Sequence, residues 1–151
     1  DRLRRCYVIS PLKSQLKLAK RMMHYWIHGP GMEYNPRRKE ALAHVDAKEN
    51  LRTVLDELER EWNRKPARIA TTARKFETST SYRDMRIIIK KEKNRPFIIV
   101  LGTGWGLTDE FIRNSEYVLK PIEPVEGDYN HLSVRSAASI IVDRLAGEEY
   151  N

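Results

Sequence analysis

The chain has 151 residues, with 28 Lys and Arg against 21 Asp and Glu, which gives a formal net charge of +7. This length fits one domain with a core of its own. Cys6 is the only cysteine, which excludes an internal disulfide, a cysteine-based zinc finger and an iron–sulfur cluster and is typical of a reducing, cytoplasmic setting. The longest apolar run, residues 97–101, is too short to cross a bilayer, so we expect no membrane span.

The positive charge is concentrated near the N-terminus. Residues 1–40 carry ten basic and three acidic side chains, while the charges of the remaining residues cancel. Four of these cations, Lys13, Lys17, Lys20 and Arg21, would share one face of a helix. Because this excess is local, we predict that they contact RNA phosphates; an ordinary solvated face is the alternative.

Short apolar segments alternate with segments of helical period along the chain. We predict strands at residues 6–9, 44–47, 68–72, 97–101 and 117–119. We predict helices from Ser10-Pro11 to about 27, at 36–43 and 48–62, after Ser81, after Thr108, and at 133–145. Such alternation favours an α/β fold with a mostly parallel sheet and helices on both faces.

The glycine-rich segment 101–107 follows the most hydrophobic predicted strand. Open α/β sheets bind ligands at the carboxyl ends of their strands, so this segment is a candidate binding loop. Its spacing is Gly-x-Gly-x-Gly, and Leu107 stands where a dinucleotide fingerprint needs glycine or alanine. No Gly-Lys-Ser/Thr follows, so a phosphate loop is excluded; a glycine turn without a ligand stays the alternative.

Two further segments could bind a ligand. Residues 127–138 form a polar loop that leads into a helix rich in small residues, where free helix amides could bind an anion. An N-cap at Ser133 with a close-packed Ala137-Ala138 seam explains the same pattern without a ligand. Residues 70–74 also follow a strand and offer Arg74 to an anionic partner.

Two histidines raise the question of a metal site. His24 and His28 are spaced i, i+4, but no glutamate completes a His-Glu-x-x-His motif and no third ligand lies nearby in sequence. We therefore predict no metal, and take both side chains as part of a solvated helix face with RNA contact as the functional option.

Several motifs together resemble the SPOUT, or α/β-knot, RNA methyltransferases. These are the Leu-Gly-x-Gly-x-Gly-Leu loop at 101–107, Lys120-Pro121-Ile122, and residues 130–140. Within that superfamily, a bacterial family of predicted S-adenosylmethionine-dependent RNA methyltransferases is similar at residues 33–36, 102–107 and 128–135. The resemblance covers essentially the whole chain.

The resemblance implies a deep C-terminal trefoil knot and a homodimer packed around it, a topology that the general rule against threaded loops would have excluded. It also implies that residues 1–151 form a single domain lacking an upstream strand and helix of the family. S-adenosylmethionine would lie against three loops and contact Thr71, Leu101, Gly102, Thr103, Gly104, Trp105, Gly106, Ile122, Asn130, Leu132, Ser133 and Val134. Trp105 would either cover the cofactor or form the dimer contact.

The implied reaction is methyl transfer to a base nitrogen or a ribose 2′-hydroxyl of tRNA or rRNA. Asp128 is the candidate base, His131 the alternative, and Arg135 or Arg74 would clamp an RNA phosphate. If these residues have no part in catalysis, Asp128 would be an acidic residue of a turn and His131 a polar residue with its hydrogen bonds satisfied within the protein. Arg135 would then be a solvent-exposed residue of a helix.

Two departures bear on the acceptor atom. The ribose methyltransferases of the superfamily have a glutamate in the glycine loop and Ser-Leu-Asn before the last helix. Here the loop has no acid and the matching residues are His131-Leu132-Ser133, which counts against ribose methylation.

Two other functions stay open. One is an RNA-binding module of the same fold that has lost catalysis. The other is an unknotted Rossmann-type nucleotide-binding domain, against which the late position and the spacing of the glycine loop count.

Overall fold

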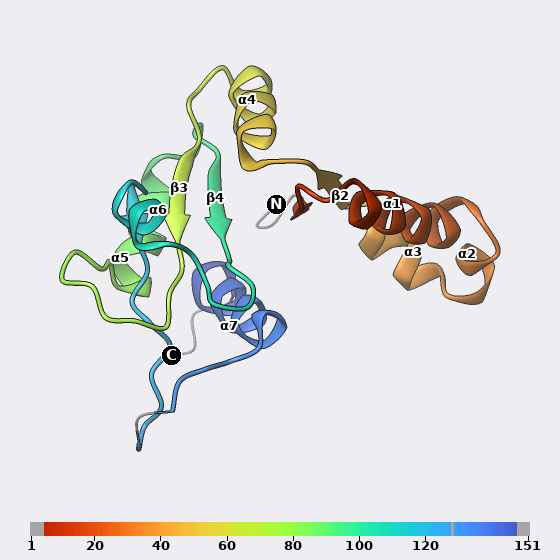
Figure 1. The fold of residues 1–151 in the computed structure, drawn as a ribbon. Helices are drawn as coiled ribbons and strands as arrows, with labels where there is room; N and C mark the ends of the chain where they lie inside the picture. Colours follow the sequence, from red (N-terminus) through yellow and green to blue (C-terminus); the bar gives the residue numbers. More distant parts are fainter. Residues whose placement is uncertain (1–4, 128, 148–151) are drawn as a thin grey trace. The chain divides into compact units, whose positions relative to one another are not determined.

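The computed structural model describes residues 5–127 and 129–147 (Figure 1). The chain divides into two compact units, residues 1–60 and 61–151. Every strand pair is parallel, which confirms the predicted α/β class with parallel strands. The prediction of one sheet was wrong for the described residues, because the strands form a two-stranded and a three-stranded sheet. That residues 1–151 act as a single domain stays a prediction.

The N-terminal unit is built on a short parallel pair. β1 (Cys6–Ile9) pairs with β2 (Val45–Lys48), and α1 (Lys13–His28), α2 (Gly31–Tyr34) and α3 (Pro36–Leu42) lie between them in sequence. Helix α4 (Leu51–Trp62) follows β2. Lys48 on β2 forms ion pairs with Asp46 at 3.0 Å and with Glu57 of α4 at 2.7 Å, so β2 and α4 are tied together.

Local hydrogen bonds explain where these helices begin. The Ser10 hydroxyl accepts from the Leu12 amide at 3.2 Å, a turn ahead of the helix, so α1 begins at Lys13 and not at the predicted Pro11. The Asn50 side chain accepts from the Thr53 amide at 2.9 Å, and α4 therefore begins after it, three residues later than predicted. Helix α2 was not predicted, because Gly29, Pro30 and Gly31 are typical of a break.

The C-terminal unit holds the three-stranded sheet. Its order is β4 (Phe97–Val100), β3 (Ala67–Ala70) and β5 (Tyr117–Val118), with β3 in the centre. Helices α5 (Tyr82–Lys91), α6 (Asp109–Arg113) and α7 (Val134–Ala146) begin where their caps predict. Ser81, Thr108 and Ser133 each accept a hydrogen bond from a backbone amide three residues on.

Buried side chains cover both faces of this sheet. Ile69 packs with Met85 of α5 and with Ile141 and Leu145 of α7. Its neighbour Ala70 packs with Ile112 of α6 and with Val118. Successive strand residues point to opposite faces, so α5 and α7 cover one face and α6 the other. Helices on both faces are thereby confirmed for this unit.

An ionic clamp holds the amino ends of the strands. Arg95, just before β4, binds both carboxylate oxygens of Glu116 at 2.7 and 2.5 Å, and its Nε donates to the Lys65 carbonyl at 2.9 Å. The hydrogen bonds from Arg95 to Glu116 and Glu92 raise the pKa of the guanidinium. The carboxyl ends of the strands lie at the opposite edge of the sheet, and the loops that follow the strands begin there. Within residues 5–127 and 129–147, no helix is long and apolar enough to span a bilayer.

Candidate cofactor and RNA site

Three loops follow the strands of the C-terminal unit. We call them the β3 loop (residues 71–75), the glycine loop (residues 101–107) and the C-terminal loop (residues 121–133). Because β3, β4 and β5 are parallel, their carboxyl ends meet at one edge of the sheet. Figure 1 shows the arrows of β3 and β4 pointing to this edge. The three segments that the resemblance assigns to the cofactor thus start from the same edge.

Thr71 and Arg74 join the β3 loop to the segments around the glycine loop. The Thr71 hydroxyl and amide both donate to the Val100 carbonyl, at 2.9 and 3.2 Å. The Arg74 guanidinium donates to the Leu107 carbonyl at 3.1 Å and forms an ion pair with Asp109. Arg74, predicted to bind RNA, thus organises the loops in this structure, and its contact with RNA stays a prediction.

The C-terminal loop is tied to the β3 loop as well. The Asn130 side-chain amide donates to the Ala73 carbonyl at 2.7 Å, and Lys75 forms an ion pair with Glu123 at 2.7 Å. Asn130 itself is half-buried, and its hydrogen bond joins two loops that are 57 positions apart in the sequence. All three loops are therefore fixed relative to one another at the edge where α/β folds bind ligands.

The glycines give the glycine loop its shape. A Cβ on Gly102 would lie 2.4 Å from the carbonyl carbon of Gly106 and 2.6 Å from the Leu107 nitrogen, so only glycine fits there. Gly104 and Gly106 have φ of +60° and +83°, and a Cβ on either would meet nothing within 4 Å. The loop is closed at its base by a Gly106 amide donating to Thr103 at 3.2 Å, and its outer side is open to a ligand.

The residues at this edge suit a nucleoside cofactor. Leu101 and Ile122 are half-buried against the core, and Leu132 is 44% exposed, so apolar surface is offered beside open glycine backbone. Apolar contacts with a few placed backbone donors and acceptors are what sites for such ligands provide. The predicted set of Thr71, residues 101–106, Ile122, Asn130 and residues 132–134 therefore fits S-adenosylmethionine, and their individual contacts stay predictions.

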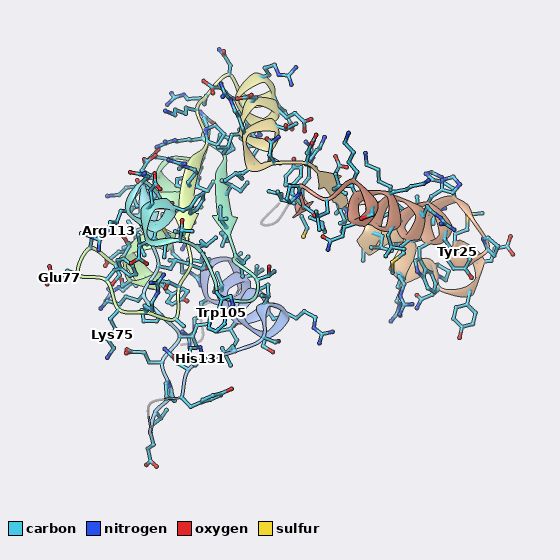
Figure 2. All side chains as sticks on the ribbon, viewed as in Figure 1. Tyr25, Lys75, Glu77, Trp105, Arg113 and His131 are labelled. Atoms are coloured by element: carbon cyan, nitrogen blue, oxygen red, sulfur yellow. The ribbon has the colours of Figure 1, made fainter. Side chains whose placement is uncertain are left out.

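The candidate catalytic residues lie at the start of α7. Asp128 falls outside the described residues. His131 is exposed, and its ring lies 5.8 Å from the ring of Tyr129 in an edge-on arrangement. Arg135 is exposed in the first turn of α7, where Ser133 is the N-cap. Figure 2 shows His131 and Trp105 at the loop end of the C-terminal unit. Trp105 is fully exposed, so none of the residues that the structure describes covers its ring.

The predicted RNA-binding cations lie together along α1. They line an open groove of about 900 Å³, which is also lined by Leu16, His24, Tyr25, Gly29 and Pro30. Sequence reasoning did not single out Tyr25 for this surface, although an aromatic residue among cations is a usual signal of RNA contact. His24 and His28 have ring centroids 5.4 Å apart. In the part of the chain that the structure describes, no group of three or more possible metal ligands gathers.

A family model described as SAM-dependent RNA methyltransferase matches residues 2–147. The chain belongs to this family. The description of the family names S-adenosylmethionine as the cofactor and RNA as the class of substrate of its members. The resemblance inferred from the motifs is thereby confirmed at the level of the family.

Individual relatives support the same assignment. A tRNA (guanine-N(1)-)-methyltransferase of Nitratidesulfovibrio vulgaris is 35% identical over 144 residues, which are 95% of this chain and 33% of that protein. One of the same name from Oleidesulfovibrio alaskensis is 33% identical over 142 residues, 94% of this chain and 32% of that protein. An uncharacterized protein of Aquifex aeolicus is 36% identical over 139 residues, 92% of this chain and 67% of that protein. The chain thus spans about one third of the length of the two named relatives.

A solved structure supports the fold. The crystal structure of a probable methyltransferase from Bordetella pertussis Tohama I matches with a TM-score of 0.54 and 16% identity, over 94% of each chain. At this identity the likeness concerns the fold alone.

Proposed function

We propose that this chain is a catalytic methyltransferase that modifies a base nitrogen in tRNA or rRNA. The observation that carries the proposal is the set of ties from Thr71, Arg74 and Asn130, which fixes the three family loops around one edge of the sheet. An inactive RNA-binding module of the same fold would keep these loops as well, so methyl transfer itself decides between the two functions.

When bound, S-adenosylmethionine supplies a sulfonium methyl group that a nitrogen or oxygen of RNA can attack in line. The glycine loop and the C-terminal loop would hold the cofactor through backbone groups and the side chains of Leu101, Ile122 and Leu132. Asp128, or His131 as the alternative, would accept the proton that the RNA nitrogen loses. Arg135 would hold a phosphate beside the acceptor nucleotide. Alignment of the reactants by these loops supplies much of the acceleration.

A base nitrogen is favoured over a ribose hydroxyl for two reasons. The glycine loop carries no acid, unlike the loop of the ribose methyltransferases. The named relatives are tRNA (guanine-N(1)-)-methyltransferases. Because this chain matches only a third of those proteins, guanine N1 is one acceptor to be tested among the base nitrogens.

The proposal includes the finer features that the resemblance implies. These are a C-terminal trefoil knot, a homodimer and a cytoplasmic location. RNA would be attracted to the cations of α1, since phosphate contacts dominate nucleic-acid affinity.

The experiment starts from binding of S-adenosylmethionine by calorimetry, followed by transfer of a tritiated methyl group to RNA from a strain that lacks the gene. Mass spectrometry of the nucleosides then identifies the modified atom. No binding at millimolar cofactor would contradict the proposal. Cofactor and RNA binding without incorporation of the label would favour the inactive module instead.

A paired variant tests the role of His131. We expect His131→Ala to lower the rate of transfer on the order of a hundredfold while leaving cofactor affinity nearly unchanged. His44→Ala, which removes another exposed histidine from the N-terminal unit, is the matched control and should retain the wild-type rate. Equal rates in both variants would remove His131 from the reaction.

A further inference from the structure

We propose that Trp105 and Tyr129 form a stacking platform for an unpaired nucleobase of the RNA substrate. This inference rests on the proposed function and deepens it, because it names the form in which RNA is presented to the site. Both residues belong to cofactor loops, and both are strongly exposed, at 104% for Trp105 and 78% for Tyr129. Large aromatic rings left in water beside a reaction site need a partner with a flat apolar face.

The backbone holds the Trp105 ring away from the body of the protein. Gly104 and Gly106, on either side of it, both have positive φ, which turns the chain sharply around the indole. The base of the loop is fixed by the close approach of Gly102 to Gly106 and by the hydrogen bond from Arg74 to Leu107. The exposed position of Trp105 is thus a property of a fixed loop.

Tyr129 is presented in a comparable way. Its neighbour Asn130 is anchored to Ala73, and its ring meets the edge of His131 at an interplanar angle of 67°. Through Asn130 and Arg74, the C-terminal loop and the glycine loop are both fastened to the β3 loop. A base that stacks on either ring would therefore lie beside the loops that hold the cofactor.

The chemistry of the two rings favours a nucleobase over a second copy of the chain. Two aromatic side chains bury on the order of 300–500 Å² together, whereas a standard interface needs about 800 Å² from each partner. The residues next to Trp105 are glycines and Thr103, and the leucines at the two ends of the loop, Leu101 and Leu107, are half-buried, so the loop exposes no second large apolar side chain beside the indole. An unpaired base offers a π face to an aromatic ring regardless of its sequence, and Arg135, exposed in the first turn of α7, offers a cation to a phosphate of the same strand.

The test compares short single-stranded RNAs that have either intact bases or abasic positions of the same charge. Wild-type protein should bind the intact RNA more tightly, on the order of tenfold, because stacking on one ring is worth this much. Trp105→Ala should lose most of this preference and raise the KM for RNA by a similar factor. Trp105→Phe keeps a ring and should recover much of both. Tyr129→Ala should show a smaller loss of the same kind.

Val125→Ala is the matched control, because Val125 is a fully exposed apolar residue of the C-terminal loop without a ring. It should leave the base preference and the KM unchanged. Cofactor affinity, measured by calorimetry, should stay within a fewfold of wild type in Tyr129→Ala and Val125→Ala. In Trp105→Ala the same measurement separates the platform from the cofactor contact that the resemblance implies for Trp105.

Three results would overturn the inference. If wild type and Trp105→Ala prefer intact over abasic RNA to the same extent, Trp105 does not stack on a base. A large loss of cofactor affinity in Trp105→Ala assigns the ring to the cofactor. A change of oligomeric state by light scattering assigns it to a second copy. If the wild-type protein neither binds S-adenosylmethionine nor methylates RNA, the proposed function itself fails, an outcome distinct from these three.

Discussion

The two units of the chain differ in what they bury and in what they display. Among the described residues, the N-terminal unit buries only Ala47 and Val54 of its hydrophobic side chains, and none of α1. The C-terminal unit buries nine hydrophobic residues on both faces of its sheet. Conversely, the groove lined by four cations lies on α1. We infer that the C-terminal unit supplies the stability and the cofactor loops, and that the N-terminal unit supplies the charge that attracts RNA.

The largest expected effect tests where the stability lies. Met85 is fully buried in the core under α5, and Ile87 of the same helix is 42% exposed. We expect Met85→Ala to lower the free energy of unfolding in urea by about 2–5 kcal/mol, since it removes buried contacts and leaves a cavity. Ile87→Ala, the control, should cost less than about 1 kcal/mol. Similar losses in both variants would break the comparison.

The next effect concerns the shape of the glycine loop. Gly102→Ala places a Cβ against backbone atoms that cannot move without reshaping the loop, so we expect cofactor binding to weaken at least about tenfold, or 1.4 kcal/mol. Gly104→Ala meets no neighbour and carries only the cost of a left-handed residue, about 1 kcal/mol. Calorimetry with S-adenosylmethionine measures the difference. The assignment of the cofactor to this loop would be wrong if the Gly102 variant bound as wild type does.

A smaller effect tests the separation of RNA attraction from cofactor binding. A plot of log RNA affinity against log salt concentration should become less steep when Lys17 and Lys20 are replaced with Gln. We expect its slope to fall by about 0.7 for each phosphate contact that is lost. Replacing Lys91 and Lys93, exposed lysines at the end of α5 and just after it, removes the same charge from the other unit. We expect this control to keep the wild-type dependence on salt and both pairs to keep the wild-type affinity for cofactor. Equal losses in the two pairs would mean that only net charge matters.

The smallest effect concerns pH and the N-terminal unit. Burial raises the pKa of Asp46, but the hydrogen bonds from Lys48 and from the Ala47 amide outweigh it and lower the pKa below its usual value. The carboxylate therefore stabilises the folded unit above about pH 4, and this contribution is lost as the pH falls through the lowered pKa. Because Asp46 is partly exposed and screened, we expect less than about 1 kcal/mol.

Urea unfolding from neutral pH to about pH 3 measures the contribution of Asp46. Asp46→Asn should flatten the acid limb of the stability curve. Asp56→Asn, an exposed carboxylate of α4, should not flatten it. An unchanged acid limb in the Asp46 variant would contradict the role given to the pair with Lys48.

Short-range features of the fold could be predicted from the sequence, and long-range ones could not. The caps at Ser81 and Ser133 were predicted because a hydroxyl and an amide three residues apart decide them. The division of the strands into two sheets depends on which strands pair with each other, and no local sequence pattern predicts that pairing. The hydrogen bond from Asn130 to Ala73 joins residues 57 positions apart, so the motif predicted that Asn130 matters but not what it binds.

The exposed position of Trp105 lies between these cases. Its glycine neighbours indicate a sharp turn, and a sequence alone does not say whether the turn points into the core or into water. The approach of Gly102 to Gly106 decides it, and this is visible only in three dimensions.

The β3 loop acts as a single anchor point. Every tie described above that joins two of the three loops has one end in residues 71–75, which follow the central strand of the sheet. Loosening this one segment would release the glycine loop and the C-terminal loop together. How firmly these five residues are held would then govern the entry and exit of a ligand. Substitutions among them should change the positions of both neighbouring loops, even where the sequence of neither loop is altered.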